Sequence, residues 1–212
     1  PIARNELIAR VMRRFAMAGS EADLNYCARL LDLSPDKAGT SQLISGMLQA
    51  FEGRQIEKLP NALVKALDEY QSSLGNSALA LGMRRGDARS IDAALRVVAN
   101  ESAPVSERLS YIEILGQIKQ PRVISSLLGR LRSGDSSIKL ATLKALQNYD
   151  DPKISRYILG AYHSTLLAEH GVRATANRVL ASRKTWAADF LARVDQWHIK
   201  ADTVAMDVVQ QL

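Results

Sequence analysis

Apolar residues recur at three- and four-residue spacing along almost the whole chain, with polar residues between them. This is the period of an amphipathic α-helix, whereas a half-buried strand alternates at every second residue. No segment shows a convincing run of alternating β-branched residues. The pattern therefore predicts an all-α chain, with helices near residues 4–18, 21–32, 36–51, 60–70, 73–84, 88–99, 104–118, 121–131, 136–148, 152–162, 165–181, 184–195 and 202–211.

Residues typical of helix starts stand between these apolar runs. Ser20 precedes Asp23 by three residues, which is the spacing of a capping box. Ser34 and Asp151 each precede a proline, whose missing N–H costs nothing in the first turn of a helix. We therefore expect Ser20, Ser34 and Asp151 to cap helices.

The apolar positions also repeat over a longer distance. A set of three in one predicted helix returns 31 residues later (140 minus 109), as does a proline that opens the next helix: Leu109, Ile112, Leu115 and Pro121 correspond to Leu140, Leu143, Leu146 and Pro152. The match weakens where Ser155 falls on the position of Ile124. Two-helix units that repeat every 31–34 residues are typical of α-solenoids. The sequence thus predicts an α-solenoid of antiparallel helical hairpins, a HEAT-like or ARM-like superhelix; the alternative is an ordinary helical bundle with helices of similar length.

The repeat is not uniform along the chain. It is clearest across residues 88–162, less regular beyond them, and weak before residue 70. Terminal units of a solenoid are atypical because one of their faces meets water. We expect an N-terminal helical part at 1–70, irregular or capping, with a loop at 51–59, and a HEAT-like repeat domain at 71–212 that forms one continuous solenoid.

The composition fits a protein with a substantial core, since 47% of its residues are hydrophobic and 24% are charged. A single cysteine, Cys27, excludes an internal disulfide. No stretch approaches the roughly 20 apolar residues that span a bilayer, so we expect no membrane insertion. The chain begins with Pro1 and not with Met, which predicts a fragment of a longer protein.

Motifs for catalysis and cofactor binding are missing or incomplete. Ser34 and Lys37 match the S-x-x-K pattern of penicillin-recognising enzymes, but its partner motifs are absent and a helix cap explains the same letters. Cys27 lies in an apolar helix, where we expect a buried, inert thiol. His163 and His170 stand seven residues apart, a spacing that suits a metal site poorly, and His198 is isolated. The sequence predicts no enzyme, no cofactor and no metal site.

The net charge of +6 raises the question of an anionic partner. Six basic residues fall near predicted inter-helix turns and could align into a stripe for an anion or a protein partner: Arg130, Arg132, Arg173, Arg178, Arg183 and Lys184. Acidic residues are interspersed, which favours an ordinary solvated surface. The two tryptophans, Trp186 and Trp197, could contact DNA. However, Trp186 stands where a helix of the last pair begins, and we expect it to pack in the core.

The end of the chain carries a family resemblance. Its segments His170–Val194, Ile199–Val204 and Asp207–Leu212 include Leu180-Ala-Ser-Arg183 followed by Trp186. They resemble a HEAT-like region of the planctomycete-type multidomain proteins described as membrane-bound dehydrogenase-like and haem-binding. In that family a β-propeller precedes this region and a c-type haem domain with a C-x-x-C-H motif follows it. The resemblance implies a scaffolding role beside redox domains and an extracytoplasmic setting, and it transfers no catalytic residue.

Two classes of function follow from these observations. The first is a non-catalytic HEAT-like scaffold that binds another protein or a neighbouring domain of the same chain. The second is a HEAT-like alkylpurine DNA glycosylase or a DNA-binding solenoid, which a sequence pI of about 9.6 favours and the dispersed charge opposes.

Overall fold

A computed structural model describes residues 2–53, 56, 58–74 and 76–210. Within these ranges the chain is helix and connecting segment without a β-strand, which confirms the all-α prediction. The chain divides into two compact units, residues 1–94 and 95–212, each of which is described by itself. None of the helices in the described ranges is long and apolar enough to cross a membrane.

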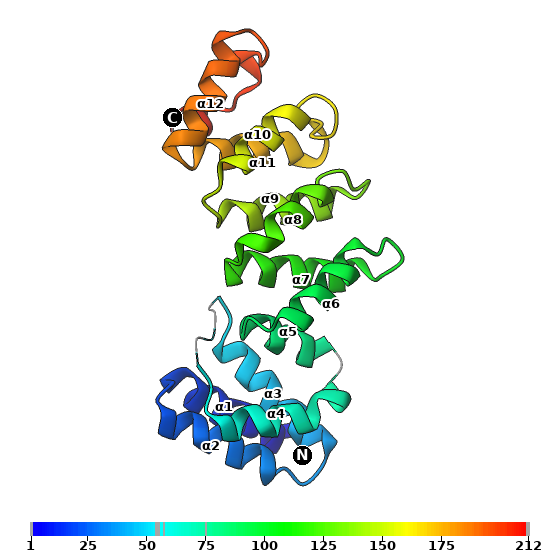
Figure 1. The fold of residues 1–212 in the computed structure, drawn as a ribbon, viewed down its shortest axis with the longest axis vertical. Helices are drawn as coiled ribbons and strands as arrows, with labels where there is room; N and C mark the ends of the chain where they lie inside the picture. The colour runs from blue at the N-terminus through cyan, green and yellow to red at the C-terminus, as the bar shows by residue number, and fades with distance from the viewer. Residues whose placement is uncertain (1, 54–55, 57, 75, 211–212) are drawn as a thin grey trace. The chain divides into compact units, whose positions relative to one another are not determined.

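The first unit is built around the packing of α1 on α3. Its helices are α1 (Ile2–Ala18), α2 (Glu21–Asp32), α3 (Lys37–Ala50), α4 (Asn61–Leu74) and α5 (Asn76–Arg84), and the start of α6 (Ala88–Ala99). α2 contacts α1, α3 and α4, while α5 contacts α3 and α4 (Figure 1). Met12, Leu31, Ile44 and Leu63 are fully buried in the resulting core. The described residues of the predicted loop at 51–59 are turn or irregular, as expected.

The second unit contains two rows of helices. Its elements after α6 are α7 (Val105–Ile118), a 3₁₀ turn (Pro121–Val123), α8 (Ile124–Arg130), α9 (Ser136–Gln147), α10 (Pro152–Ala161), a 3₁₀ turn (Glu169–Gly171), α11 (Val172–Ala181), α12 (Lys184–Asp195), a 3₁₀ turn (Ala201–Thr203) and α13 (Met206–Val209). α9 packs between α7 and α11, and α10 packs between α8 and α12 (Figure 1). α8 also packs on α9, and α12 on α11, so the rows share one core.

Two of the three predicted caps are confirmed. The Asp23 N–H donates to Ser20 Oγ at the start of α2, and the Lys153 N–H donates to Asp151 Oδ1 at 2.8 Å at the start of α10. The prediction for Ser34 is wrong, because Asp36 caps α3 and accepts the Gly39 N–H at 2.7 Å.

Two predicted helices are shorter in the structure. The segment predicted at 165–181 becomes helical only from Val172, because His170 and Gly171 have φ values of +51° and +74°, which no right-handed helix accommodates. The described part of the segment predicted at 202–211 holds the end of the 3₁₀ turn and the short helix α13, since Val204 is extended and separates them.

The cap of α9 gives a test of helix capping in the second unit. Asp135 Oδ1 accepts the N–H groups of Ser137 and Ile138, and the Ser137 hydroxyl bond lowers the pKa of this carboxyl. We expect Asp135→Ala to reduce the free energy of unfolding by about 1 kcal/mol near neutral pH. Because the pKa is lowered on folding, this contribution exists above the unfolded-state pKa and is lost as pH falls through the folded value. Urea unfolding at about pH 7 and about pH 3 should therefore show the difference closing in acid. A smaller loss is expected for Asp135→Asn, and a pH-independent difference would contradict the assignment.

Candidate interaction surface

Each of the helices α10 and α12 buries one side and leaves the other open. In α10, Ile154, Ser155 and Ile158 are buried, while in α12 the buried residues are Trp186, Ala187 and Phe190. The residues between them recur at intervals of three or four, so they form one stripe on each helix. These stripes are Pro152, Arg156 and Leu159 on α10, and Thr185, Asp189, Ala192, Arg193 and Gln196 on α12.

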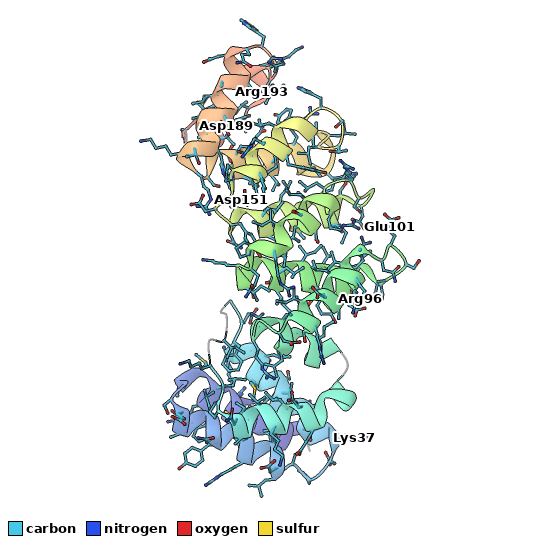
Figure 2. The ribbon with its side chains drawn as sticks, in the orientation of Figure 1. Lys37, Arg96, Glu101, Asp151, Asp189 and Arg193 are labelled. Atoms are coloured by element: carbon cyan, nitrogen blue, oxygen red, sulfur yellow. The ribbon has the colours of Figure 1, made fainter. Side chains whose placement is uncertain are left out.

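The two stripes face each other across a groove with a volume of about 800 Å³. Figure 2 shows Asp189 and Arg193 one turn apart along α12, with Asp151 at the start of α10. The groove thus holds one carboxylate and the guanidinium groups of Arg156 and Arg193 in a mainly apolar trough formed by the aliphatic parts of both helices.

A second groove lies on the other side of α10. It has a volume of about 320 Å³ and is lined by Arg132, which follows α8, and by Arg156, Tyr157, Gly160, Ala161, Ser164 and Thr165. Arg156 lines both grooves, so its side chain lies on the ridge of α10 between them. We call the two grooves together the α8–α10–α12 surface. It carries an arginine from each of three successive segments of one helix row.

Asp189 contacts a residue of the core. The hydroxyl of the fully buried Ser155 lies 3.0 Å from Asp189 Oδ2 and 3.2 Å from the Pro152 carbonyl oxygen, so its one proton is shared between these two acceptors. Ser155 occupies the position at which the preceding repeat has Ile124, so a polar residue replaces an apolar one exactly one repeat later in the same row. The consequence is a carboxylate at the groove that has a hydrogen-bond partner in the core.

The arginines of this surface retain unused donors. Arg156 uses its Nε for the Pro152 carbonyl at 3.2 Å, and Arg132 lies over the Tyr157 ring with Cζ 5.9 Å from the centroid. Arg193 makes neither a side-chain hydrogen bond nor an ion pair with any residue in the described ranges. A guanidinium carries five N–H donors in a planar fork, so each of these side chains can still bind a planar oxyanion.

The six basic residues predicted from the sequence do not gather into one stripe of free charges. Arg130 donates to the Ala99 carbonyl, and Arg178 forms an ion pair with Asp207 at 2.8 Å. Lys184 is exposed at the first position of α12. Of the six, only Arg132 lines one of the two grooves.

Two more of the six hold neighbouring segments together. Arg173 donates to the Leu166 carbonyl at 3.0 Å and lies over the Tyr162 ring. Arg183 donates to the Gln147 carbonyl at 3.1 Å and lies over the Trp186 ring, with Cζ 5.0 Å from the centroid. Arg183 thus places its charge at the carbonyl end of α9, where the helix dipole favours a cation, while Arg173 bonds to the segment between α10 and α11. The position of these two arginines near turns therefore reflects packing between segments and not a stripe of free charges.

Helical spacing in the sequence, and not distance from predicted turns, would have indicated Asp189, Arg156 and Arg193 as residues of this surface. Arg156 lies four residues after Pro152, and Asp189 and Arg193 lie four residues apart. Both sets occupy the polar side of a helix whose other side is apolar. The substitution of Ser155 for an apolar repeat position marks the same place.

The remaining candidates for chemistry have structural roles. Cys27 is fully buried, and burial raises the pKa of its thiol to about 11, as suits an inert side chain. Ser34 bonds the Asp36 carbonyl and Thr40, and no base contacts it in the described ranges. His163 lies outside the regular helices and its Nε2 is 2.7 Å from the His198 carbonyl. Across the described ranges, no three His, Cys, Asp or Glu side chains come together as metal ligands would.

A third groove lies in the other helix row, between α7 and α9, with a volume of about 840 Å³. Its two charged side chains, Glu113 and Lys144, are of opposite sign, and Glu113 accepts a hydrogen bond from Gln117 at 3.3 Å. This groove therefore presents no excess charge to a partner.

Comparison with known protein families, with curated proteins and with solved structures finds no match for this chain.

Proposed function

We propose that the chain is a HEAT-like α-solenoid that acts as a non-catalytic scaffold and binds a partner protein or a neighbouring domain through its α8–α10–α12 surface. The observation that carries the proposal is the pair of adjoining grooves, which share Arg156: the first lies between α10 and α12, and the second is lined by α10, by the segment after it and by Arg132. Repeated helix pairs leave such grooves between successive members of a row, and solenoid proteins bind partners along them.

Two further features support a solenoid in the second unit. The helix contacts run from α7 to α9 to α11 and from α8 to α10 to α12, so each helix contacts its row neighbours. Arg130 and Arg183 each reach the carbonyl end of a helix that lies about one repeat earlier in the chain, at Ala99 and Gln147. Contacts that join each repeat to the next are the basis of solenoid stability.

The resemblance of residues 170–212 to the HEAT-like region of dehydrogenase-like, haem-binding multidomain proteins supplies a setting for this scaffold. We propose that it links or positions redox domains of a larger extracytoplasmic protein. In that family the redox groups belong to the domains that flank the HEAT-like region, so the role proposed for this chain needs no cofactor of its own.

A DNA titration tests the scaffold against DNA binding. We expect a fluorescent duplex to bind the chain no more tightly than a non-specific basic surface does, with a Kd weaker than about 1 μM at roughly 150 mM salt. The Arg178→Gln variant serves as a charge-matched control, because Arg178 lies outside both grooves. Sub-micromolar, salt-sensitive binding that is lost in Arg156→Gln would support a DNA-binding solenoid instead. Release of a damaged base from an alkylated duplex would support the glycosylase.

A further inference from the structure

The chemistry of the α8–α10–α12 surface narrows the class of partner. Its three arginines, Arg132, Arg156 and Arg193, present guanidinium donors, and Asp189 is the single acidic residue that lines either groove. Arginine binds carboxylates in a bidentate manner with two parallel N–H···O bonds. Charge complementarity therefore favours an anionic ligand with separated oxyanions, such as the carboxylates of an acidic peptide.

Asp189 discriminates between an acidic peptide and DNA, the two polymers that carry such charges. The Ser155 hydroxyl, which also lies near the Pro152 carbonyl, bonds the Asp189 carboxylate at 3.0 Å and so favours a negative charge at the groove. An extended peptide offers backbone N–H donors to this carboxylate, and its alternate side chains point to the same side about 7 Å apart. The DNA backbone has no such donor and carries one charge per roughly 1.7 Å of duplex axis. The carboxylate thus favours a peptide and repels a phosphate backbone.

The trough between the charges is suited to a peptide main chain. Leu159 and Ala192 line the first groove, and the exposed Gly160 and the half-buried Ala161 line the second, on the other side of α10. Tyr157, half-buried beneath Arg132, adds an aromatic surface. Peptide-binding grooves commonly combine apolar contacts with a few polar groups that fix orientation.

We infer that the α8–α10–α12 surface binds an acidic, extended segment of a partner protein, whose carboxylates pair with Arg156, Arg193 and Arg132 and whose backbone N–H groups are accepted by Asp189. This inference rests on the proposed scaffold function and names the chemistry of the partner.

Fluorescence anisotropy with two probes tests the inference. The first is a labelled peptide of about twelve residues that alternates glutamate with threonine, which stays extended because threonine is β-branched. The second is a labelled duplex of about twelve base pairs. We expect the full chain to bind the peptide in the micromolar range and more tightly than the duplex at roughly 150 mM salt. The variant Arg156→Gln/Arg193→Gln should weaken peptide binding at least about tenfold. Arg178→Gln, which removes the same kind of charge outside the grooves, should change it less than about twofold.

Asp189→Asn gives the sharper outcome, because the amide can still accept from Ser155 while the negative charge is gone. We expect duplex binding to strengthen at least about threefold and peptide binding to change much less, so that the selectivity ratio falls. All these residues are exposed, and unchanged circular dichroism spectra will show that the variants fold.

Three results would overturn the inference: no binding of the peptide by the unmodified chain, equal loss in Arg178→Gln and in the double variant, or a selectivity ratio that Asp189→Asn leaves unchanged. Tighter binding of the duplex than of the peptide would overturn the scaffold function as well. Failure of both probes to bind would overturn only the assignment of an acidic partner.

Discussion

Replacing Trp186 with alanine is expected to cost the second unit about 3–5 kcal/mol of unfolding free energy, the usual range for removing a buried large aromatic side chain. Trp186 is 1% exposed at the start of α12 and belongs to the largest fully buried side chains in the described ranges. Its loss would leave a cavity beneath α12 and would remove the ring over which Arg183 lies. The Arg183 Nε is already buried without a hydrogen-bond partner, so this part of the core has little polar compensation to offer.

Urea unfolding followed by circular dichroism measures the effect, and the second tryptophan supplies a matched control. Trp197 is 89% exposed, so Trp197→Ala makes the same chemical change without a cavity and should alter stability by less than about 0.5 kcal/mol. In Trp197→Ala, the fluorescence of Trp186 alone reports the unfolding of the second unit. Similar midpoints for the two alanine variants would show that Trp186 does not stabilise the fold in this way.

Helices were predictable because their pattern is local. The apolar period placed α2, α6 and α12 at the residues where the structure has them, and Ser20 and Asp151 were recognisable as caps from two or three neighbouring letters. Ser34 was assigned wrongly for the same reason. Asp36, two residues after Ser34, caps α3 in the structure, because the cap position depends on where the backbone turns into α3, which the local sequence does not determine.

The start of α11 could not be predicted because it depends on a left-handed backbone conformation at His170. Val172 and the residues after it have the helical pattern, and residues 165–169 extend that pattern upstream. His170 nevertheless adopts a left-handed conformation, which costs energy for a residue with a Cβ and persists only where the surrounding structure requires it. Tertiary context of this sort is invisible to a periodicity argument.

The candidate surface was harder to predict than the helices, because a free arginine and a packed one look alike in sequence. Arg183 and Arg193 lie on the same helix or its cap, yet Arg183 is occupied by a carbonyl and an aromatic ring while Arg193 lines an open groove. The difference arises from which side of α12 buries Trp186. The departure of Ser155 from the repeat pattern is a local clue, but its bond to Asp189 joins two helices and cannot be predicted from local sequence.

The packing around Gly46 is a second feature that the sequence alone does not predict. A glycine inside a helix normally weakens that helix, so the sequence alone marks Gly46 as a liability within α3. The structure shows that it permits a close approach of α3 to α1, since a Cβ placed there would lie 2.1 Å from the Ala9 carbonyl oxygen and 2.9 Å from its carbon. Both contacts are to the backbone of α1, so no side-chain rotation can relieve them.

We therefore expect Gly46→Ala to destabilise the first unit by roughly 3 kcal/mol, because α1 and α3 must move apart along their shared core. Two other helical glycines provide the control: Gly129 and Gly160 have open space where a Cβ would lie, and alanine there should stabilise by about 0.5 kcal/mol. The same substitution should thus have opposite signs at matched helical positions, as measured by denaturant midpoints. Because the contact is to backbone, the double variant Ala9→Gly/Gly46→Ala should remain destabilised. Rescue by Ala9→Gly would mean that a side chain, and not the α1 backbone, sets the distance between these two helices.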